Sequence, residues 1–464
     1  MTAFSAEVHQ NEYLPPGWPV VHAIVTISAN DVDGERMSAD EDSEPEVAEI
    51  IILDCSSSMG SPHSKIETAM SATRKAIDRM RDGTWFAILA GTSHARMVYP
   101  ELEGDADDDA VQLPALARAS WATRAQAKSA VTRLTPNGGT RISTWLALAR
   151  RLFESQPATI RHAILLADGR NEHEEAAALA AELERCFGKF QCDCRGVGTA
   201  WDRSELQGIS DTLLGTTDII PDPSEMDAAF EAIMADSMSK RVGSVLLSAL
   251  TPVGGEVRFL RQVSPELLDL TDKVTWHQPA GQNGAWEVVT ELDSARPLIS
   301  VYPVGAWGNH EVREYHVCLS VVPQDIGPHN EIRAARMSLI SDGGTAVSVP
   351  VRAIWTEDDE QATRLNRQVA HFTGQEELAQ SIEEGLEAKR AGDYTTATYK
   401  LGRAAQLAHE TGNDGTIRLL QRVVDIDDPR TGTVRLREAV AKEDEMTLDA
   451  RSRKTVRLDK LLEP

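Results

Sequence analysis

The stretch EIIILDCSSSMG, residues 49–60, decides the fold of this chain. A run of four apolar residues ends directly at Asp54, and hydroxyl groups follow at Ser56 and Ser58. An uninterrupted apolar run of this length predicts a strand buried in a parallel sheet, and such sheets keep their ligand sites at the carboxyl ends of the strands. One carboxylate and two hydroxyls are hard oxygen ligands, so the pattern predicts part of a site for an ion such as Mg²⁺.

Two later stretches supply the remaining oxygen ligands. Residues 135–140, TPNGGT, predict a glycine-hinged loop that ends at the hydroxyl of Thr140, just before a helical segment. Residues 163–169, AILLADG, are a second apolar run that ends at an acid, Asp168. Aspartate before a helix is often an N-cap, which is the alternative for Asp54 and Asp168. Because both acids directly end apolar runs, we favour the metal-site hypothesis.

Taken together, the three stretches resemble the metal-ion-dependent adhesion site of von Willebrand factor type A domains. The shared pattern is Asp-x-Ser-x-Ser, then Gly-Gly-Thr, then an apolar run that ends in Asp-Gly. The resemblance implies an α/β fold with a doubly wound, mostly parallel sheet of the Rossmann-like kind. It also implies that Mg²⁺ or Mn²⁺ is bound directly by Ser56 and Ser58, and directly or through water by Asp54, Thr140 and Asp168. Such an ion keeps one coordination position for a carboxylate from a protein partner.

The motifs favour binding over catalysis. The sequence has no Gly-x-Ser-x-Gly elbow followed by a recognisable histidine and acid pair. Aspartate-nucleophile phosphatases also begin with an apolar strand and Asp, but they usually need a second Asp two residues later, where this chain has Ser56. We therefore expect a protein that is not an enzyme, and a Mg²⁺-dependent phosphatase is the less favoured hypothesis.

The expected role is that of a metal-dependent scaffold or adaptor in a bacterial signalling or stress system. Its partner would supply an Asp or Glu side chain to the metal site. The sequence also resembles the A domains found beside bacterial AAA+ ATPases, so an adaptor subunit of an ATPase machine of the MoxR or chelatase kind is the alternative. Nucleotide-dependent capture of such an ATPase would distinguish the two hypotheses.

Charge and hydropathy exclude two classes of partner. The 72 acidic and 47 basic residues among 464 give a formal charge of −25, which repels nucleic acid and anionic lipid. The first 20 residues contain no apolar core behind a basic start, and no later run approaches the roughly 18 apolar residues that span a bilayer. We expect a cytoplasmic protein without nucleic-acid or membrane partners.

The five cysteines predict reduced thiols rather than a disulfide framework. Cys186, Cys192 and Cys194 are candidates for a zinc site, but they include no Cys-x-x-Cys pair, and the last two alternate along a strand-like run. Buried strand cysteines are therefore the favoured interpretation.

The order of patterns predicts five parts of the chain. Strand and helix patterns alternate over residues 46–240, which predicts the von Willebrand A domain, with a short run at 94–99 as its antiparallel edge strand. Seven β-type runs within residues 241–356 predict a β-sandwich. The β-rich run at 17–28 has no partner nearby, so we expect residues 1–30 to pair with the sandwich and the A domain to be inserted between them.

The last two parts are predicted to be helical and flexible. Within residues 357–445, the segment 382–405 resembles one tetratricopeptide helix pair. This pair could be a helical hairpin packed on its neighbours or could form a peptide-binding groove. Residues 446–464 are basic and are expected to form a flexible tail. Phosphorylation of Thr455 or Thr447 would create a site for a phosphothreonine-reading protein; the alternative is a basic tail that lies on its own acidic body.

Overall fold

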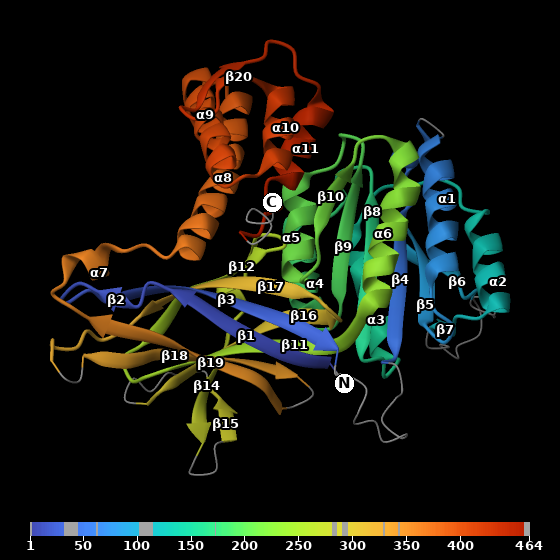
Figure 1. Cartoon of the computed structure of the whole chain (residues 1–464). Coiled ribbons are helices and arrows are strands. Elements are labelled where there is room, and N and C mark those ends of the chain that lie inside the picture. The colour runs from blue at the N-terminus through green and yellow to red at the C-terminus, as the bar shows by residue number, and fades with distance from the viewer. Residues whose placement is uncertain are drawn as a thin grey trace. The chain divides into compact units, whose positions relative to one another are not determined.

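The chain forms two compact units. The computed structural model describes residues 2–31, 45–61, 64–101, 115–171, 173–280, 285–289, 296–327, 330–341 and 344–458. The α/β unit consists of residues 34–243 with 305–308, and the sandwich unit consists of residues 1–33, 244–304 and 309–464 (Figure 1). The predicted fold class is confirmed: a mostly parallel α/β sheet is inserted into a β-sandwich, and helices follow.

The sheet of the α/β unit has the strand order β10-β9-β8-β4-β5-β6, with β7 paired to β5. The four pairings from β10 to β5 are parallel, whereas β6 and β7 pair with β5 in the antiparallel sense, as expected for the run at 94–99. The strands are β4 (Val47–Asp54), β5 (Trp85–Gly91), β6 (Ala95–Tyr99), β7 (Ala117–Arg118), β8 (Ile160–Ala167), β9 (Gln191–Val197) and β10 (Thr217–Ile220). The helices are α1 (Ser64–Arg79), α2 (Trp121–Val131), α3 (Ile142–Glu154), α4 (Ala176–Cys186), α5 (Arg203–Thr212) and α6 (Met226–Ser239), with short 3-10 turns η1 (Ser57–Gly60) and η2 (Pro223–Glu225).

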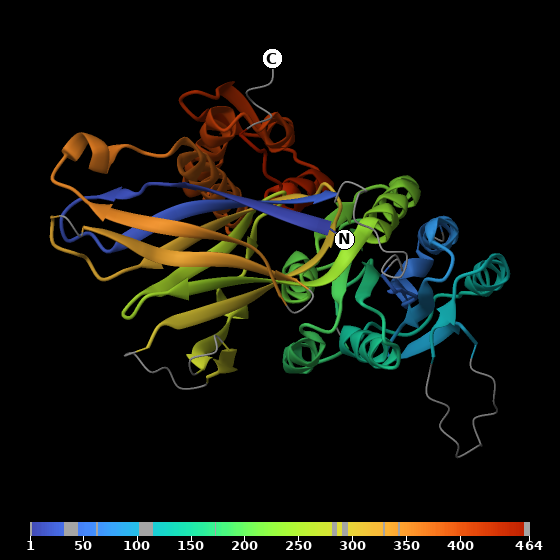
Figure 2. The ribbon, with the colours of Figure 1, turned by 60° about the horizontal axis from the view of Figure 1, so that its bottom comes forward.

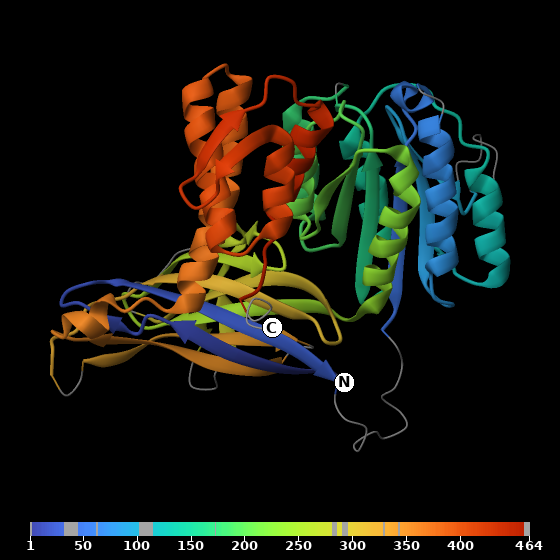
Figure 3. The same cartoon turned by 45° about the horizontal axis from the view of Figure 1, so that its top comes forward.

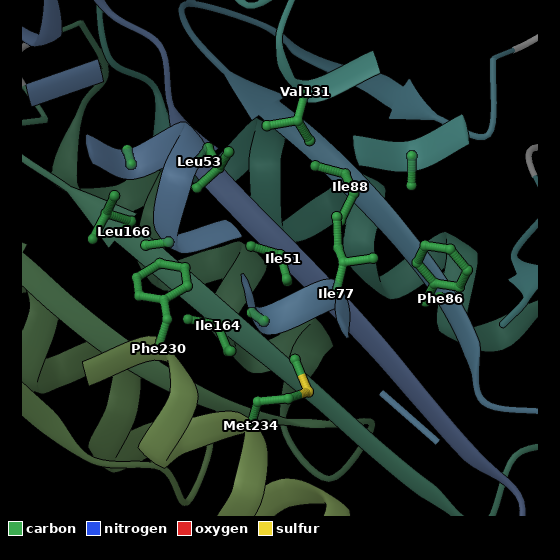
Figure 4. Packing of buried hydrophobic residues seen from close by; sticks show 14 of the residues in the cluster. Ile51, Leu53, Ile77, Phe86, Ile88, Val131, Ile164, Leu166, Phe230 and Met234 are labelled. Carbon is green, nitrogen blue, oxygen red and sulfur yellow. The ribbon is translucent and has the colours of Figure 1, made fainter. Parts of the chain in front are cut away.

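Strand β4 lies at the centre of this sheet, and all eight of its residues are buried. Ile51 and Ile164 pack with Ile77 of α1 and with Phe230 and Met234 of α6 on one face (Figure 4). Side chains alternate along a strand, so the neighbours of Ile51 are buried on the opposite face. Burial on both faces explains why the sequence shows a continuous apolar run rather than an alternating pattern.

The sandwich unit contains two sheets that lie one over the other (Figure 2). One sheet has the order β1-β3-β17-β12-β13, and the other has the order β15-β14-β16-β11-β18-β19-β2. Their strands are β1 (Thr2–Gln10), β2 (Tyr13–Leu14), β3 (Val20–Asp31), β11 (Lys240–Thr251), β12 (Glu256–Ser264), β13 (Leu268–Asp269), β14 (Thr275–Ala280), β15 (Ala285–Val288), β16 (Leu298–Gly308), β17 (Val312–Ser320), β18 (Glu331–Ser341) and β19 (Gly344–Trp355), with the 3-10 turn η3 (Thr271–Lys273).

Of the N-terminal strands, β1 and β3 belong to the first of these sheets, and β2 pairs with β19 in the second. Strand β3 lies between β1 and β17, and its residues Val20 to Ser28 pair with Val312 to Ser320. Strand β1 did not emerge from the sequence because its residues, TAFSAEVHQ, form neither a continuous apolar run nor a strict alternation, and it lies at the edge of a sheet, where several of its side chains are exposed.

Deleting residues 1–30 is expected to unfold the sandwich unit and to spare the α/β unit. The deletion removes β1 and nearly all of β3, so that β17 loses its neighbour, and it takes fully buried side chains such as Ile24 and Ile27 out of the core. Limited proteolysis of the truncated protein measures this outcome. A protease-resistant fragment spanning residues 242–355 in the truncated protein would contradict the prediction.

The C-terminal helices build on a helical hairpin. Helices α8 (Arg367–Arg390) and α9 (Tyr394–Glu410) lie side by side (Figure 3). A Cβ atom added to Gly385 would lie 2.8 Å from Leu401 Cγ, so a residue without a side chain is needed where the helices approach. The other elements are α7 (Asp359–Thr363), α10 (Asp414–Val423), α11 (Lys442–Arg451) and the two-stranded sheet of β20 (Val424–Asp428) and β21 (Thr433–Leu436). This small sheet corrects the expectation of helices throughout residues 415–445.

The structure also differs from the expected flexible tail. Helix α11 continues to Arg451 and buries residues 446–450. Beyond it, the amide of Val456 donates to Gln375 Oε1 at 2.7 Å, and Thr455 Oγ1 donates to the Val263 carbonyl at 2.7 Å. Hydrogen bonds to α8 and β12 therefore order this polar segment without an apolar repeat. Thr447 is 2% exposed, which leaves it out of reach of a kinase, and residues 459–464 lie outside the described part of the chain.

All five cysteines are buried free thiols, and Cys192 and Cys194 lie on β9 as predicted, whereas Cys186 is the last residue of helix α4 and not a strand residue. Among the described helices, none is long and apolar enough to cross a membrane.

Candidate metal centre

The two predicted aspartates lie at the same edge of the sheet. Asp54 is the last residue of β4, and Asp168 directly follows β8, which pairs with β4 in parallel. Both side chains are completely buried. The backbone amide of Asp168 donates to Asp54 Oδ2 at 3.3 Å, so the end of one strand holds the carboxylate of the other.

The two predicted serines connect these carboxylates. The amide of Ser56 donates to Asp54 Oδ1 at 2.8 Å, and the hydroxyl oxygens of Ser56 and Ser58 lie 2.9 Å apart. Ser58 Oγ in turn donates to Asp168 Oδ1 at 2.6 Å. Four of the five predicted residues therefore form one continuous chain of hydrogen bonds.

The loop that carries Thr140 is attached to the same place. The amide of Asn137 donates to the Cys55 carbonyl at 2.8 Å, and the amide of Ser57 donates to the Gly138 carbonyl at 3.0 Å. Gly138 has a φ of +71°, a conformation that side chains other than glycine rarely adopt. Thr140 is 4% exposed. The structure thus brings together the three loops that the sequence singled out.

The electrostatics of the two acids differ. Burial raises the pKa of Asp54 to about 6, although the hydrogen bonds from Ser56 work against this shift. Asp168 has a cationic partner, because Lys65 Nζ lies 2.9 Å from its Oδ2. Buried carboxylates are costly unless a positive charge compensates them. Two carboxylates beside serine and threonine hydroxyls form a hard-oxygen donor set, which fits a divalent ion of the Mg²⁺ type.

Among the described residues, no group of three or more histidine, cysteine, aspartate or glutamate side chains gathers in a way that could hold a metal. The candidate centre is consistent with this result, because it contains only two acids and otherwise uses hydroxyl groups. The same result removes support from a zinc site at Cys186, Cys192 and Cys194.

Comparisons with known proteins assign the family. The sequence model of the von Willebrand factor type A domain matches residues 48–219, and that of the von Willebrand factor type A C-terminal domain matches residues 406–452. A solved von Willebrand factor type A structure from Catenulispora acidiphila is 42% identical, with a TM-score of 0.84, and the match covers 98% of this chain and 97% of that one. The chain belongs to the von Willebrand factor type A family.

A second solved structure shares the fold over the whole length. The ArnB paralog VWA2 from Sulfolobus acidocaldarius is 12% identical, with a TM-score of 0.52, and the match covers 97% of this chain and 98% of that one. The comparison with curated proteins gives no match. Von Willebrand A domains are generally interaction modules, and they often act through a metal ion.

The start of α3 in this von Willebrand A domain is held by three side chains that no sequence motif indicated, namely Asn171, His173 and Glu174. The amide of Thr140 donates to His173 Nδ1 at 3.2 Å, and the amide of Ile142 donates to Asn171 Oδ1 at 3.1 Å. The amide of Ser143 donates to Glu174 Oε1 at 3.0 Å. A sequence signal exists: Arg141 at the N-cap position of α3 has no cap side chain to offer, so the free amides need acceptors from elsewhere.

Proposed function

We propose that the von Willebrand A domain binds Mg²⁺ or Mn²⁺ and uses the ion to bind a carboxylate of a protein partner. The proposed ligands are Asp54, Ser56, Ser58, Thr140 and Asp168. The observation that carries this proposal is the chain of hydrogen bonds from Asp54 through both serines to Asp168, because it gathers hard oxygens around two completely buried acids.

The bound ion would supply a Lewis-acidic coordination position for an Asp or Glu of the partner. The residues of this chain hold the ligands in place. Backbone amides of Ser56 and Asp168 bind the two oxygens of Asp54, which fixes the orientation of its carboxylate. Ser58 is exposed whereas both acids are buried, so the centre is open to solvent on the side of Ser58. A partner side chain can approach from that side.

The chain is strongly acidic, with a formal charge of −25, and this charge opposes the approach of an acidic partner. A divalent ion would reverse the charge locally and direct such a partner to one place. We therefore propose a metal-dependent scaffold or adaptor in bacterial signalling or stress response. Among the described residues at the site, nothing favours an enzymatic role.

Affinity capture from the host lysate is expected to depend on both the ion and Asp54. The full chain should retain a partner in the presence of Mg²⁺ and release it in EDTA. The variant Asp54→Ala should retain at least about tenfold less of the partner, because it lacks one of the two acidic ligands. Ser57→Ala is the matched control, since Ser57 is exposed and lies between the two proposed serine ligands without being one. Its hydroxyl donates to the Gly138 carbonyl at 3.0 Å, but the Ser57 amide donates to the same carbonyl and remains in the variant.

Retention that persists in EDTA, or that is equal for Asp54→Ala and Ser57→Ala, would show that the metal centre does not carry the interaction. Nucleotide-dependent capture of an ATPase would define the partner as an ATPase machine. Mg²⁺-dependent release of phosphate from a phosphatase substrate by the full chain, but not by Asp54→Ala, would replace the adaptor role by an enzymatic one.

A further inference from the structure

Lys65 contacts the candidate metal centre, although no sequence motif assigned it a role. It is the second residue of α1, and its Nζ lies 2.9 Å from Asp168 Oδ2. The Lys65 side chain is 17% exposed and that of Asp168 is completely buried. Ser58 Oγ donates a hydrogen bond to the other oxygen of Asp168, Oδ1. Both oxygens of one proposed ligand are therefore already engaged inside the protein.

The charges at the centre are unequal. Asp54 receives hydrogen bonds from the backbone amides of Ser56 and Asp168, which are neutral groups, whereas Asp168 is paired with an ammonium. The two carboxylates and Lys65 together carry one net negative charge. A buried acid that lacks a positive neighbour is costly, so Lys65 stabilises Asp168 when no metal ion is present.

We propose that Lys65 is an internal counter-cation of the metal centre that competes with the divalent ion. This inference rests on the proposed function, because it assigns a role to Lys65 at the same site. In the metal-free protein the ammonium neutralises Asp168. A divalent ion that binds to the same carboxylate meets this positive charge within a few ångströms and is repelled by it.

The competition has a consequence for the order of binding. The two aspartates, Lys65 and a divalent ion together carry one net positive charge, and one carboxylate from a partner cancels it. Lys65 thus weakens binding of the metal alone and favours its binding together with an acidic partner. It also keeps the metal-free domain folded, because Asp168 is never left without a cation.

The variant Lys65→Met tests the proposal in the full chain with two measurements. Calorimetry is expected to show that it binds Mg²⁺ alone at least about tenfold more tightly than the wild type, because the repelling charge is gone. Thermal unfolding in EDTA is expected to show a melting temperature lower by about 5 °C or more, because Asp168 loses its partner. Lys75→Met is the matched control: Lys75 lies on the same helix and pairs with Asp227 near the surface, with 49% of its side chain exposed.

The outcomes separate this inference from the proposed function. If the wild type binds Mg²⁺ and Lys65→Met binds it equally or less tightly, Lys65 does not compete and the inference is wrong. If neither protein binds Mg²⁺ or Mn²⁺, the metal centre itself is wrong and the inference goes with it. If Lys65→Met binds Mg²⁺ and the wild type does not, the inference is supported. Should Lys65→Met fail to fold, Lys65→Gln keeps a hydrogen-bond donor without the charge, and its Mg²⁺ affinity decides the question in the same way.

Discussion

Asp54→Ala is expected to weaken the binding of Mg²⁺ and Mn²⁺ by at least about 100-fold, because it removes one of the two carboxylates among the proposed ligands, and even groups that only support a ligand contribute about 10- to 100-fold. This loss of metal affinity should be larger than expected from the removal of one ligand out of five. The only other acid of the centre among the described residues, Asp168, is already neutralised by Lys65, so the variant leaves no uncompensated negative charge for the ion.

The fold should survive this change. Asp54 accepts hydrogen bonds from two backbone amides, and losing them costs about 1–3 kcal/mol for each group left unsatisfied. Against this loss, the variant removes a buried carboxylate whose pKa burial has raised to about 6. The sheet core around Ile51 is independent of the centre, so circular dichroism of the variant should match that of the wild type.

Calorimetry measures the affinity, and the melting temperature gives a second reading. A saturating ion stabilises the folded state by mass action, by about 2.7 kcal/mol at a concentration one hundred times its dissociation constant. The wild type and Ser57→Ala should both gain this stabilisation, whereas Asp54→Ala should gain at most about 0.4 kcal/mol at the same ion concentration. Equal Mg²⁺ affinity in Asp54→Ala and the wild type would show that the ion binds elsewhere or not at all.

The sequence predicted the acids of the centre because their signal is local. Asp54 and Asp168 each end an apolar run, and parallel strands place such ends at one edge of the sheet. Lys65 carries no such signal. Lysine near the start of a helix is usually solvated, and only the packing of α1 against the sheet directs this one to Asp168.

The elements that the sequence did not predict depend on contacts between distant residues. The hairpin of β20 and β21 packs on α9, where a Cβ atom added to Gly402 would lie 2.2 Å from the Gly432 carbonyl. That close approach has no counterpart in the periodicity of residues 415–445. The segment after α11 is likewise held by hydrogen bonds that Val456 and Thr455 donate to the Gln375 side chain and the Val263 carbonyl, which composition does not reveal.

A second charged cluster lies at the amino ends of the same strands and gives the other large expected effect. His162 of β8 lies between two acids: its Nδ1 is 2.8 Å from Glu49 Oε1, and its Nε2 is 3.2 Å from Asp193 Oδ2. Glu49 is completely buried and also accepts a hydrogen bond from Ser237 Oγ at 2.7 Å. One imidazolium therefore serves two carboxylates inside the core.

The pKa of His162 follows from these neighbours. Burial acts to lower it, but the charge of Glu49 and the hydrogen bond to Asp193 act in the opposite direction and raise the pKa from 6.5 to about 10. Burial acts to raise the pKa of Asp193, but its hydrogen bond to His162 and the charge of Arg195 hold this pKa well below its usual value. His162 is accordingly protonated at neutral pH in the folded protein.

His162→Leu is expected to destabilise the α/β unit by about 3–5 kcal/mol at pH 7, because it leaves the buried Glu49 and the half-buried Asp193 without their shared cation. Hydrogen exchange of peptides from β4 and β8 measures the change within this unit. His94→Leu is the control, since the His94 side chain is exposed. Equal protection in the two variants would contradict the assignment of His162 as the shared cation.

The pH dependence of the same variant distinguishes a charge effect from a loss of packing. The folded pKa of His162, about 10, is above its unfolded value of 6.5, so its protonation stabilises the fold fully below pH 6.5, and this contribution is lost as the pH rises toward 10. The difference in stability between the wild type and His162→Leu should therefore be largest near pH 6 and should shrink steadily between pH 7 and pH 10. A difference that stays constant over this range would mean that His162 stabilises the unit by its shape, and that the acids on either side of it do not depend on its charge.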